Sequence, residues 1–218
     1  MRRLLAASFA GLLLASATVP AAPGPAPAMS GGAPKVFLTR EEALELAFPD
    51  CERKRLTTYL TKAQTKRVAE LAKVPFDRSV VFAYEARRKG ELVGTAYFDT
   101  HKVRTHREIL MIVVGPAARI RRIEVLAFAE PVDYLPRGAW YGQFTGRGLD
   151  DELELKRAIK GVTGATLTAR ATTAAARRLL AVHQVRGELA LEKKRRAARG
   201  GAAPAPRPRR RAPGGEVR

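Results

Sequence analysis

The chain has 218 residues, 40 Lys or Arg against 21 Asp or Glu, and a formal net charge of +19 at pH 7. This length is sufficient for one domain with a hydrophobic core. Cys51 is the only cysteine, which excludes an intrachain disulfide framework, a Cys-Cys metal motif and a c-type haem motif. The sequence also lacks a P-loop, a dinucleotide-binding glycine fingerprint and a Ser-His-Asp arrangement.

The start of the chain predicts a signal peptide over residues 1–17. Arg2 and Arg3 form a basic region, Leu4–Leu14 forms an apolar one, and Ala15-Ser16-Ala17 supplies small residues for cleavage. We therefore expect an exported protein, with a bacterial periplasm as the favoured location. An uncleaved leader that keeps the protein associated with the membrane is the alternative.

Composition divides the rest of the chain into three parts. Residues 18–34 are rich in Pro, Ala and Gly and are typical of a flexible linker, residues 35–192 form the predicted domain, and residues 193–218 form a basic tail. Residues 192–218 hold ten Lys or Arg and two Glu, a composition that favours disorder beyond the last helix. The tail is a candidate to contact anionic lipid or an acidic redox partner, with nucleic acid less favoured. A solvated tail without a specific partner is the alternative.

Two capping boxes predict the first helices of the domain. Thr39-x-x-Glu42 begins a short helix through Ala47, which Pro49 ends. Thr61-x-x-Gln64 begins a second helix that continues to about Lys73.

The next part of the chain predicts strands and then a long helix. The expected strands are Ser79–Arg87, Glu91–Asp99, Glu108–Val114 and Arg119–Phe128, the first two joined by a turn at Lys89-Gly90. The last helix runs from about Leu167 toward Arg195, with an apolar stripe at Ala171, Ala175, Leu179, Val182, Val185 and Leu189. We therefore expect an α+β fold, with a small antiparallel sheet of about four strands, packed helices and a long C-terminal helix.

A segment of small and hydroxyl residues precedes this last helix. Thr163-Gly164-Ala165-Thr166-Leu167-Thr168 places three hydroxyl groups and two small residues at its start. A helix N-terminus offers unpaired N–H donors and a positive dipole end, so it can hold a phosphate group. A simple threonine cap is the alternative interpretation of the same residues.

The stretch Ile159–Thr168 resembles the signature of the FMN-binding domain family, Asp-x-x-Ser/Thr-Gly-Ala-Thr/Ser. The family includes flavoprotein subunits of the ion-pumping NADH:quinone and ferredoxin:NAD oxidoreductases and many small exported flavoproteins. The resemblance implies that FMN is joined to the Thr166 hydroxyl through a phosphoester, with Thr163, Gly164 and Ala165 as the recognition frame and Leu167 and Thr168 completing the motif. It also implies a flavin transferase as a maturation partner.

One position departs from the family pattern, because Lys160 stands where the family has its leading Asp. If the transferase needs that carboxylate, the change affects covalent attachment. A cation beside a phosphate is electrostatically favourable, so FMN binding without a covalent bond is the alternative.

Other segments supply further candidates near a flavin. Glu130 follows the last predicted strand, where respiratory members of the family have a Glu-Thr-Pro-Gly-Leu-Gly segment, and we predict that it borders the flavin. A rigid surface loop fixed by proline is the alternative. Trp140 or Tyr141 could stack on the ring system. His101 and His106 are candidate proton donors, although no carboxylate partner is visible and a surface or turn position is favoured.

These observations predict an exported electron carrier that holds FMN on Thr166 and needs a separate electron donor and acceptor, with membrane redox proteins as candidates. A binding protein without redox chemistry, which docks on anionic membranes or nucleic acid through its tail, is one alternative. A flavin reductase with non-covalent FMN is another.

Overall fold

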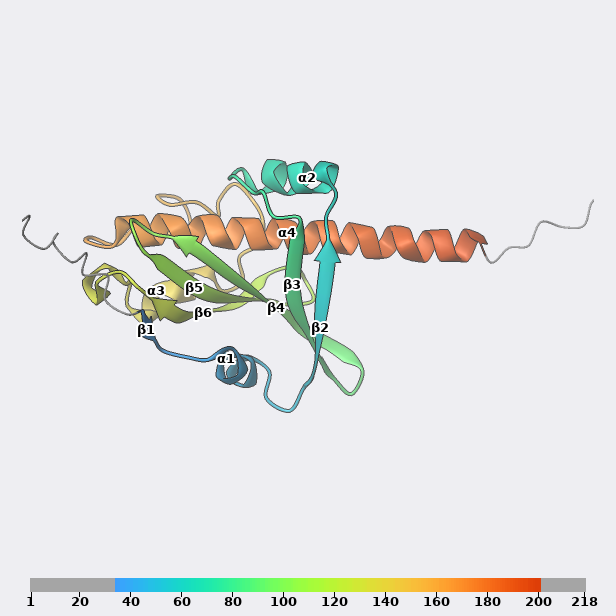
Figure 1. Ribbon diagram of the computed structural model, residues 1–218, viewed down its shortest axis with the longest axis horizontal. Coiled ribbons are helices and arrows are strands. Elements are labelled where there is room, and N and C mark those ends of the chain that lie inside the picture. The colour runs from blue at the N-terminus through green and yellow to red at the C-terminus, as the bar shows by residue number, and fades with distance from the viewer. Residues whose placement is uncertain (1–33, 201–218) are drawn as a thin grey trace, which may run out of the picture. The chain divides into compact units, whose positions relative to one another are not determined.

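The computed structural model describes residues 34–200, which form an α+β fold around one antiparallel sheet (Figure 1). The expected fold class and the long C-terminal helix are therefore confirmed, but the sheet has six strands and not about four. The signal peptide expected over residues 1–17, the linker up to residue 33 and the tail from residue 201 lie outside the described residues.

The strands are β1 (Lys35–Val36), β2 (Glu52–Tyr59), β3 (Val80–Arg88), β4 (Glu91–Lys102), β5 (Arg107–Val114) and β6 (Ile120–Phe128), arranged in the order β1-β6-β5-β4-β3-β2. The α-helices are α1 (Arg40–Ala47), α2 (Lys62–Ala72), α3 (Gly138–Tyr141) and α4 (Thr166–Gly200), and two 3₁₀ turns, Val132–Tyr134 and Gly142–Phe144, flank α3. Helix α4 continues past its expected end near Arg195, so residues 193–200 of the expected tail are helical. Among the described helices, none is both long enough and apolar enough to cross a membrane.

Both predicted capping boxes are present. The Thr39 side chain accepts a hydrogen bond from the backbone N–H of Glu42, and the Glu42 carboxylate accepts one from the N–H of Thr39. Thr61 and Gln64 make the same reciprocal bonds at the start of α2. Each pair satisfies two N–H groups that have no partner inside the helix.

The two strands that the sequence did not predict lie at the edges of the sheet. Strand β2 has the sequence ERKRLTTY, and most of its side chains are exposed. Strand β1 has only two residues, which pair with Phe128 and Ala127 of β6. Neither segment shows the alternation of apolar and polar residues that marks a half-buried strand, because an edge strand is held mainly by backbone pairing.

The sheet has a hydrophobic core on each face. Helices α2 and α4 cover one face, where Tyr97, Leu110 and Ile112 of the sheet pack against Leu179 and other apolar residues of α4. Helix α1 covers part of the other face, where its buried residues pack against Met111 and Val113. In Figure 1 the two helical layers lie on opposite sides of the strands.

The sheet opens between the neighbouring strands β3 and β4. The pairing of β3 with β4 ends at Ala83 and Tyr97. Beyond these residues, Val80–Phe82 pair only with β2 and Phe98–Lys102 pair only with β5, so β3 and β4 diverge (Figure 1). Arg78 spans the opening, because its guanidinium donates to the backbone carbonyl of Thr100 at 3.0 Å.

A buried arginine ties α4 to the end of α2. Arg177 is 7 % exposed and donates to the carbonyl of Ala72 at 2.6 Å, to that of Asp150 at 2.8 Å and to that of Leu153 at 3.0 Å. The carbonyls at a helix C-terminus have no partner inside the helix, and this guanidinium supplies one to α2. It also fixes the loop that leads toward the start of α4.

We expect Arg177→Ala to lower the free energy of unfolding by about 3 kcal/mol, because it leaves three carbonyls without their charged donor. Arg170→Ala, at an exposed position of the same helix, is the matched control and should change it by less than about 0.5 kcal/mol. Urea unfolding of both variants measures the difference. Equal stability of the two variants would contradict this role of Arg177.

Candidate functional site

The segment before α4 makes a tight turn into the helix. The N–H of Ala165 donates to the carbonyl of Val162 at 3.2 Å, and Gly164 has a φ of +81°, in the left-handed region that favours glycine. The carbonyl of Ala165 accepts the first helical hydrogen bond, from the N–H of Ala169 at 2.9 Å, so Ala165 is the N-cap residue. An alanine has no side-chain oxygen, and α4 therefore lacks the capping bonds that Thr39 and Thr61 provide.

This start leaves the first turn of α4 open to a ligand. Thr166 is the first residue of the helix and is exposed, and its hydroxyl makes one long hydrogen bond, 3.4 Å to the carbonyl of Val162. The first N–H groups of an α-helix have no acceptor inside the helix. Uncapped N–H groups and the positive dipole end together favour an anion here.

Most of the site residues expected from the sequence border one pocket of about 240 Å³. These are Gly164, Ala165, Thr166, Leu167, Thr168 and Glu130. Val103, Arg104 and Tyr134 complete its lining, whereas Thr163 lies outside it. The structure thus brings Glu130 to the start of α4, although more than thirty residues separate them in the sequence.

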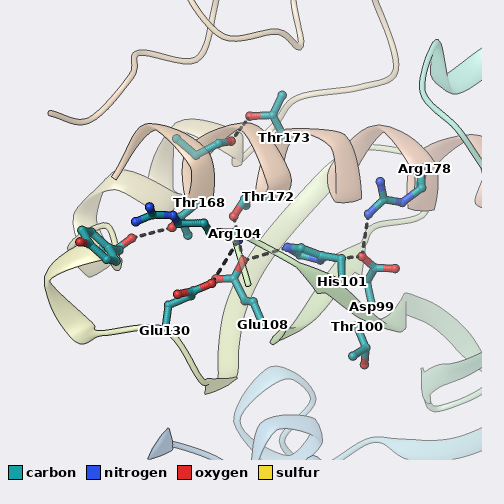
Figure 2. Close-up of polar contacts among 12 residues, drawn as sticks. Asp99, Thr100, His101, Arg104, Glu108, Glu130, Thr168, Thr172, Thr173 and Arg178 are labelled. Carbon is teal, nitrogen blue, oxygen red and sulfur yellow. Dashed lines mark hydrogen bonds and ion pairs between the residues drawn. The ribbon is translucent and has the colours of Figure 1, made fainter. Parts of the chain in front are cut away.

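Glu130 holds a turn in this pocket. One of its carboxylate oxygens accepts hydrogen bonds from the backbone N–H groups of Arg104 (3.2 Å), Thr105 (2.6 Å) and His106 (2.7 Å), which lie between β4 and β5. Figure 2 shows Glu130 and Arg104. Burial raises the pKa of Glu130, but these N–H groups outweigh burial and hold the pKa below its usual value. Glu130 therefore positions Arg104 at the edge of the pocket.

The hydroxyl of Thr168 also has a structural partner. It donates to the backbone carbonyl of Tyr134 at 2.6 Å and so connects the first turn of α4 to the loop after β6. Of the two threonines that line the pocket, Thr166 is therefore the one with an exposed side chain.

The aromatic side chain at the pocket is Tyr134. It is 38 % exposed and borders the pocket together with Leu167. Trp140 and Tyr141, the stacking candidates from the sequence, are instead buried in the core and border none of the pockets described for residues 34–200. The Trp140 indole N–H donates to the carbonyl of Lys160 at 2.7 Å, and this bond fixes the chain just before the motif.

A second hollow, of about 530 Å³, lies on the other side of Thr166. Thr166 and Arg170 border it, and these two residues share a helix face because they are four positions apart. Cations and carboxylates both border the rest of this hollow, including Lys156, Arg157, Asp151 and Glu154. Thr166 therefore lies between two hollows, with an arginine beside each, Arg104 at the first and Arg170 at the second.

His101 belongs to a buried polar cluster and not to a surface turn, in contrast to the interpretation favoured from the sequence. Its Nδ1 lies 2.9 Å from a carboxylate oxygen of Asp99 and its Nε2 lies 3.0 Å from one of Glu108 (Figure 2). Both carboxylates are fully buried. Arg178 and Arg78 pair with Asp99 at 3.0 Å and 2.7 Å. Strand pairing places Glu108 opposite His101, whereas Asp99 lies two residues before His101 on the same face of β4.

Two groups of this cluster have shifted pKa values. Burial lowers the pKa of His101, but the two carboxylates outweigh burial and raise the pKa above its usual value. Burial raises the pKa of Asp99, but the hydrogen bond with His101 and the charges of Arg178 and Arg78 outweigh it and hold the pKa well below its usual value. The cluster therefore favours a protonated imidazole beside an ionised Asp99.

The raised pKa of His101 predicts a pH dependence of stability. The native state holds the His101 proton more tightly than the unfolded chain, so this contribution is complete below the usual histidine pKa of about 6.5. It is lost as the pH rises from there through the higher native value. We expect the free energy of unfolding of the wild type to fall between pH 6 and pH 9 relative to that of His101→Gln.

Urea unfolding of the wild type and of His101→Gln is measured at both pH values. The quantity compared is the change in the free energy of unfolding of each protein with pH, because His101→Gln also removes two ion pairs at either pH. His106→Gln is the control, since the His106 ring pairs with no carboxylate of the described residues. The same pH dependence in the wild type and in His101→Gln would show that His101 does not cause it.

Comparison of the chain with family models, curated proteins and solved structures finds no match. The resemblance to the FMN-binding family therefore rests on the motif before α4. Within residues 34–200, no group of three or more His, Cys, Asp or Glu side chains is arranged to hold a metal ion.

Proposed function

We propose that the protein is an exported electron carrier that holds FMN on the Thr166 hydroxyl through a phosphoester bond. The observation that carries the proposal is the exposed position of Thr166 on an uncapped first helical turn, between two hollows that Arg104 and Arg170 border. The resemblance of Ile159–Thr168 to the family signature supplies the identity of the cofactor.

The residues around Thr166 fit a phosphate group. The first turn of α4 presents N–H groups and a positive dipole end, and Arg170 follows one turn later on the same face. Arg104 borders the pocket on the opposite strand turn. A phosphoester at Thr166 would thus gain favourable charge interactions from both sides, and a phosphate held without a covalent bond would gain the same ones.

The size of the pocket suits a carrier more than an enzyme that encloses a substrate. Its volume of about 240 Å³ is below the range of roughly 300–1,000 Å³ that is common for small-molecule sites. Tyr134 and Leu167 would contact part of a flavin ring and leave the rest accessible to redox partners. FMN, when bound, supplies the transfer of one or two electrons, and the protein supplies attachment, orientation and a positive field.

We expect Thr166→Ala to abolish a covalent flavin and to leave the fold unchanged, because the Thr166 side chain is exposed. The measurement is the intact mass of the denatured protein, exported from a host that has the flavin transferase. The wild type should carry the added mass of one FMN less one water, located on the peptide that contains Thr166. Thr145→Ala, which removes an exposed hydroxyl outside the motif, is the control and should keep the added mass. A covalent adduct in Thr166→Ala, or an unmodified wild type, would overturn covalent attachment at Thr166.

We expect Lys160→Asp, which introduces the family residue, to increase the fraction of protein that carries FMN severalfold if the transferase recognises that carboxylate. The Lys160 side chain is exposed, and its backbone is fixed by the indole of Trp140 and the amide of Gln143, so the substitution should not disturb the fold. Lys160→Ala is the control, because it removes the cation without adding a carboxylate. An equal fraction in all three proteins, measured by intact mass, would show that attachment does not depend on this residue.

A further inference from the structure

A separate cavity occupies the opening of the sheet between β3 and β4. Its volume is about 620 Å³, and it shares no lining residue with the pocket at Thr166. Val80–Phe82 border it from β3, and Thr100–Lys102 border it from β4. Leu179 of α4, on the opposite face, also borders it, so the cavity reaches through the opening into the apolar layer beneath.

Five cationic side chains and no carboxylate side chain line this cavity. The cations are Arg40, Arg55, Arg78, Lys102 and Arg107, which come from α1, the loop after α2 and three strands. Arg78 pairs with Asp99. The other four have no carboxylate within salt-bridge distance among residues 34–200. Gathering like charges around one cavity costs free energy, which an anionic ligand would recover.

Aromatic rings lie among these charges. Phe76, Phe82, Tyr84 and Phe98 line the same cavity, and Phe82 is 47 % exposed. The guanidinium of Arg55 lies 4.6 Å from the centroid of the Phe82 ring, and that of Arg40 lies 5.4 Å from the Phe98 centroid. These contacts hold the two guanidinium groups beside apolar surface, so the cavity offers positive charge and ring faces together.

The shape of the opening decides between a small molecule and a peptide strand. An added strand needs a spacing of about 4.8 Å to the strands on both sides. Strands that diverge provide that spacing at one level only, and β3 and β4 no longer pair beyond Ala83 and Tyr97, where their ribbons diverge (Figure 1). A wedge of this kind suits a compact ligand with an apolar body directed toward Leu179.

We propose that the cavity between β3 and β4 binds a phosphorylated compound with a planar or apolar body. Arginine guanidinium groups match phosphate oxygens in charge and geometry, and several cations suit more than one negative charge. The aromatic rings receive the body of the ligand. A soluble nucleotide and a phospholipid head with its acyl chains share this chemistry.

The test is calorimetric titration of the full chain, at low salt, with ADP, with dihexanoyl phosphatidic acid and with inorganic pyrophosphate. We expect ADP or the short-chain lipid to bind more tightly than pyrophosphate, and whichever binds identifies the source. Arg55→Gln/Lys102→Gln should weaken that binding by about tenfold or more. Phe82→Ala should weaken it by roughly tenfold and leave pyrophosphate binding unchanged.

The control is Lys62→Gln/Arg67→Gln, which removes the same charge from exposed positions of α2 and should leave binding unchanged. Circular dichroism of each variant checks that the fold is retained. Absence of binding by all three probes would overturn the proposal. So would pyrophosphate binding as tight as that of the larger probes, or equal binding by both double variants, which would assign the interaction to the basic surface in general.

Discussion

The packing of α4 against the sheet is the interaction on which the rest of the structure depends. Alanines at Ala169, Ala175, Ala176 and Ala181 are fully buried, and such small side chains let the helix lie close to the strands and to α2. The larger buried side chains of this helix are Leu179, Leu180, Val182 and Val185, whose burial stabilises the packing. Because the buried stripe begins at Ala165, the packing fixes the first turn while the side chain of Thr166 stays exposed.

Local sequence patterns predicted the elements that are stabilised locally. The capping boxes at Thr39 and Thr61, the turn at Lys89-Gly90 and the apolar stripe of α4 are each contained within one short segment. Strand β2 could not be found in this way, because its backbone partners lie in β3, more than twenty residues away, and its first four side chains are charged and exposed. The role of Arg177 could not be predicted for the same reason. A charged residue in a helical segment does not indicate the three distant carbonyls to which it donates.

Only the local part of the candidate site could be predicted from the sequence. The motif before α4 is local, and its uncapped turn follows from the alanine at Ala165. The approach of Glu130 came from the resemblance, but its bonds to three backbone N–H groups depend on a turn that only the folded chain forms. Tyr134 was overlooked because the larger pair Trp140-Tyr141 offered more aromatic surface, and that surface is used in the core.

The distribution of charge connects the two proposed sites. Where the fold buries carboxylates, as at Asp99, it surrounds them with Arg78, Arg178 and His101. The chain has more Lys and Arg than Asp and Glu, and some of the cations without a carboxylate partner line the cavity between β3 and β4. At Thr166 the N–H groups of α4 would supply much of the attraction for the proposed phosphate, which would lie within one turn of them. The proposed anion recognition at the helix would therefore depend on close backbone contact, whereas that proposed at the open sheet would depend on side-chain charge, which salt screens more strongly.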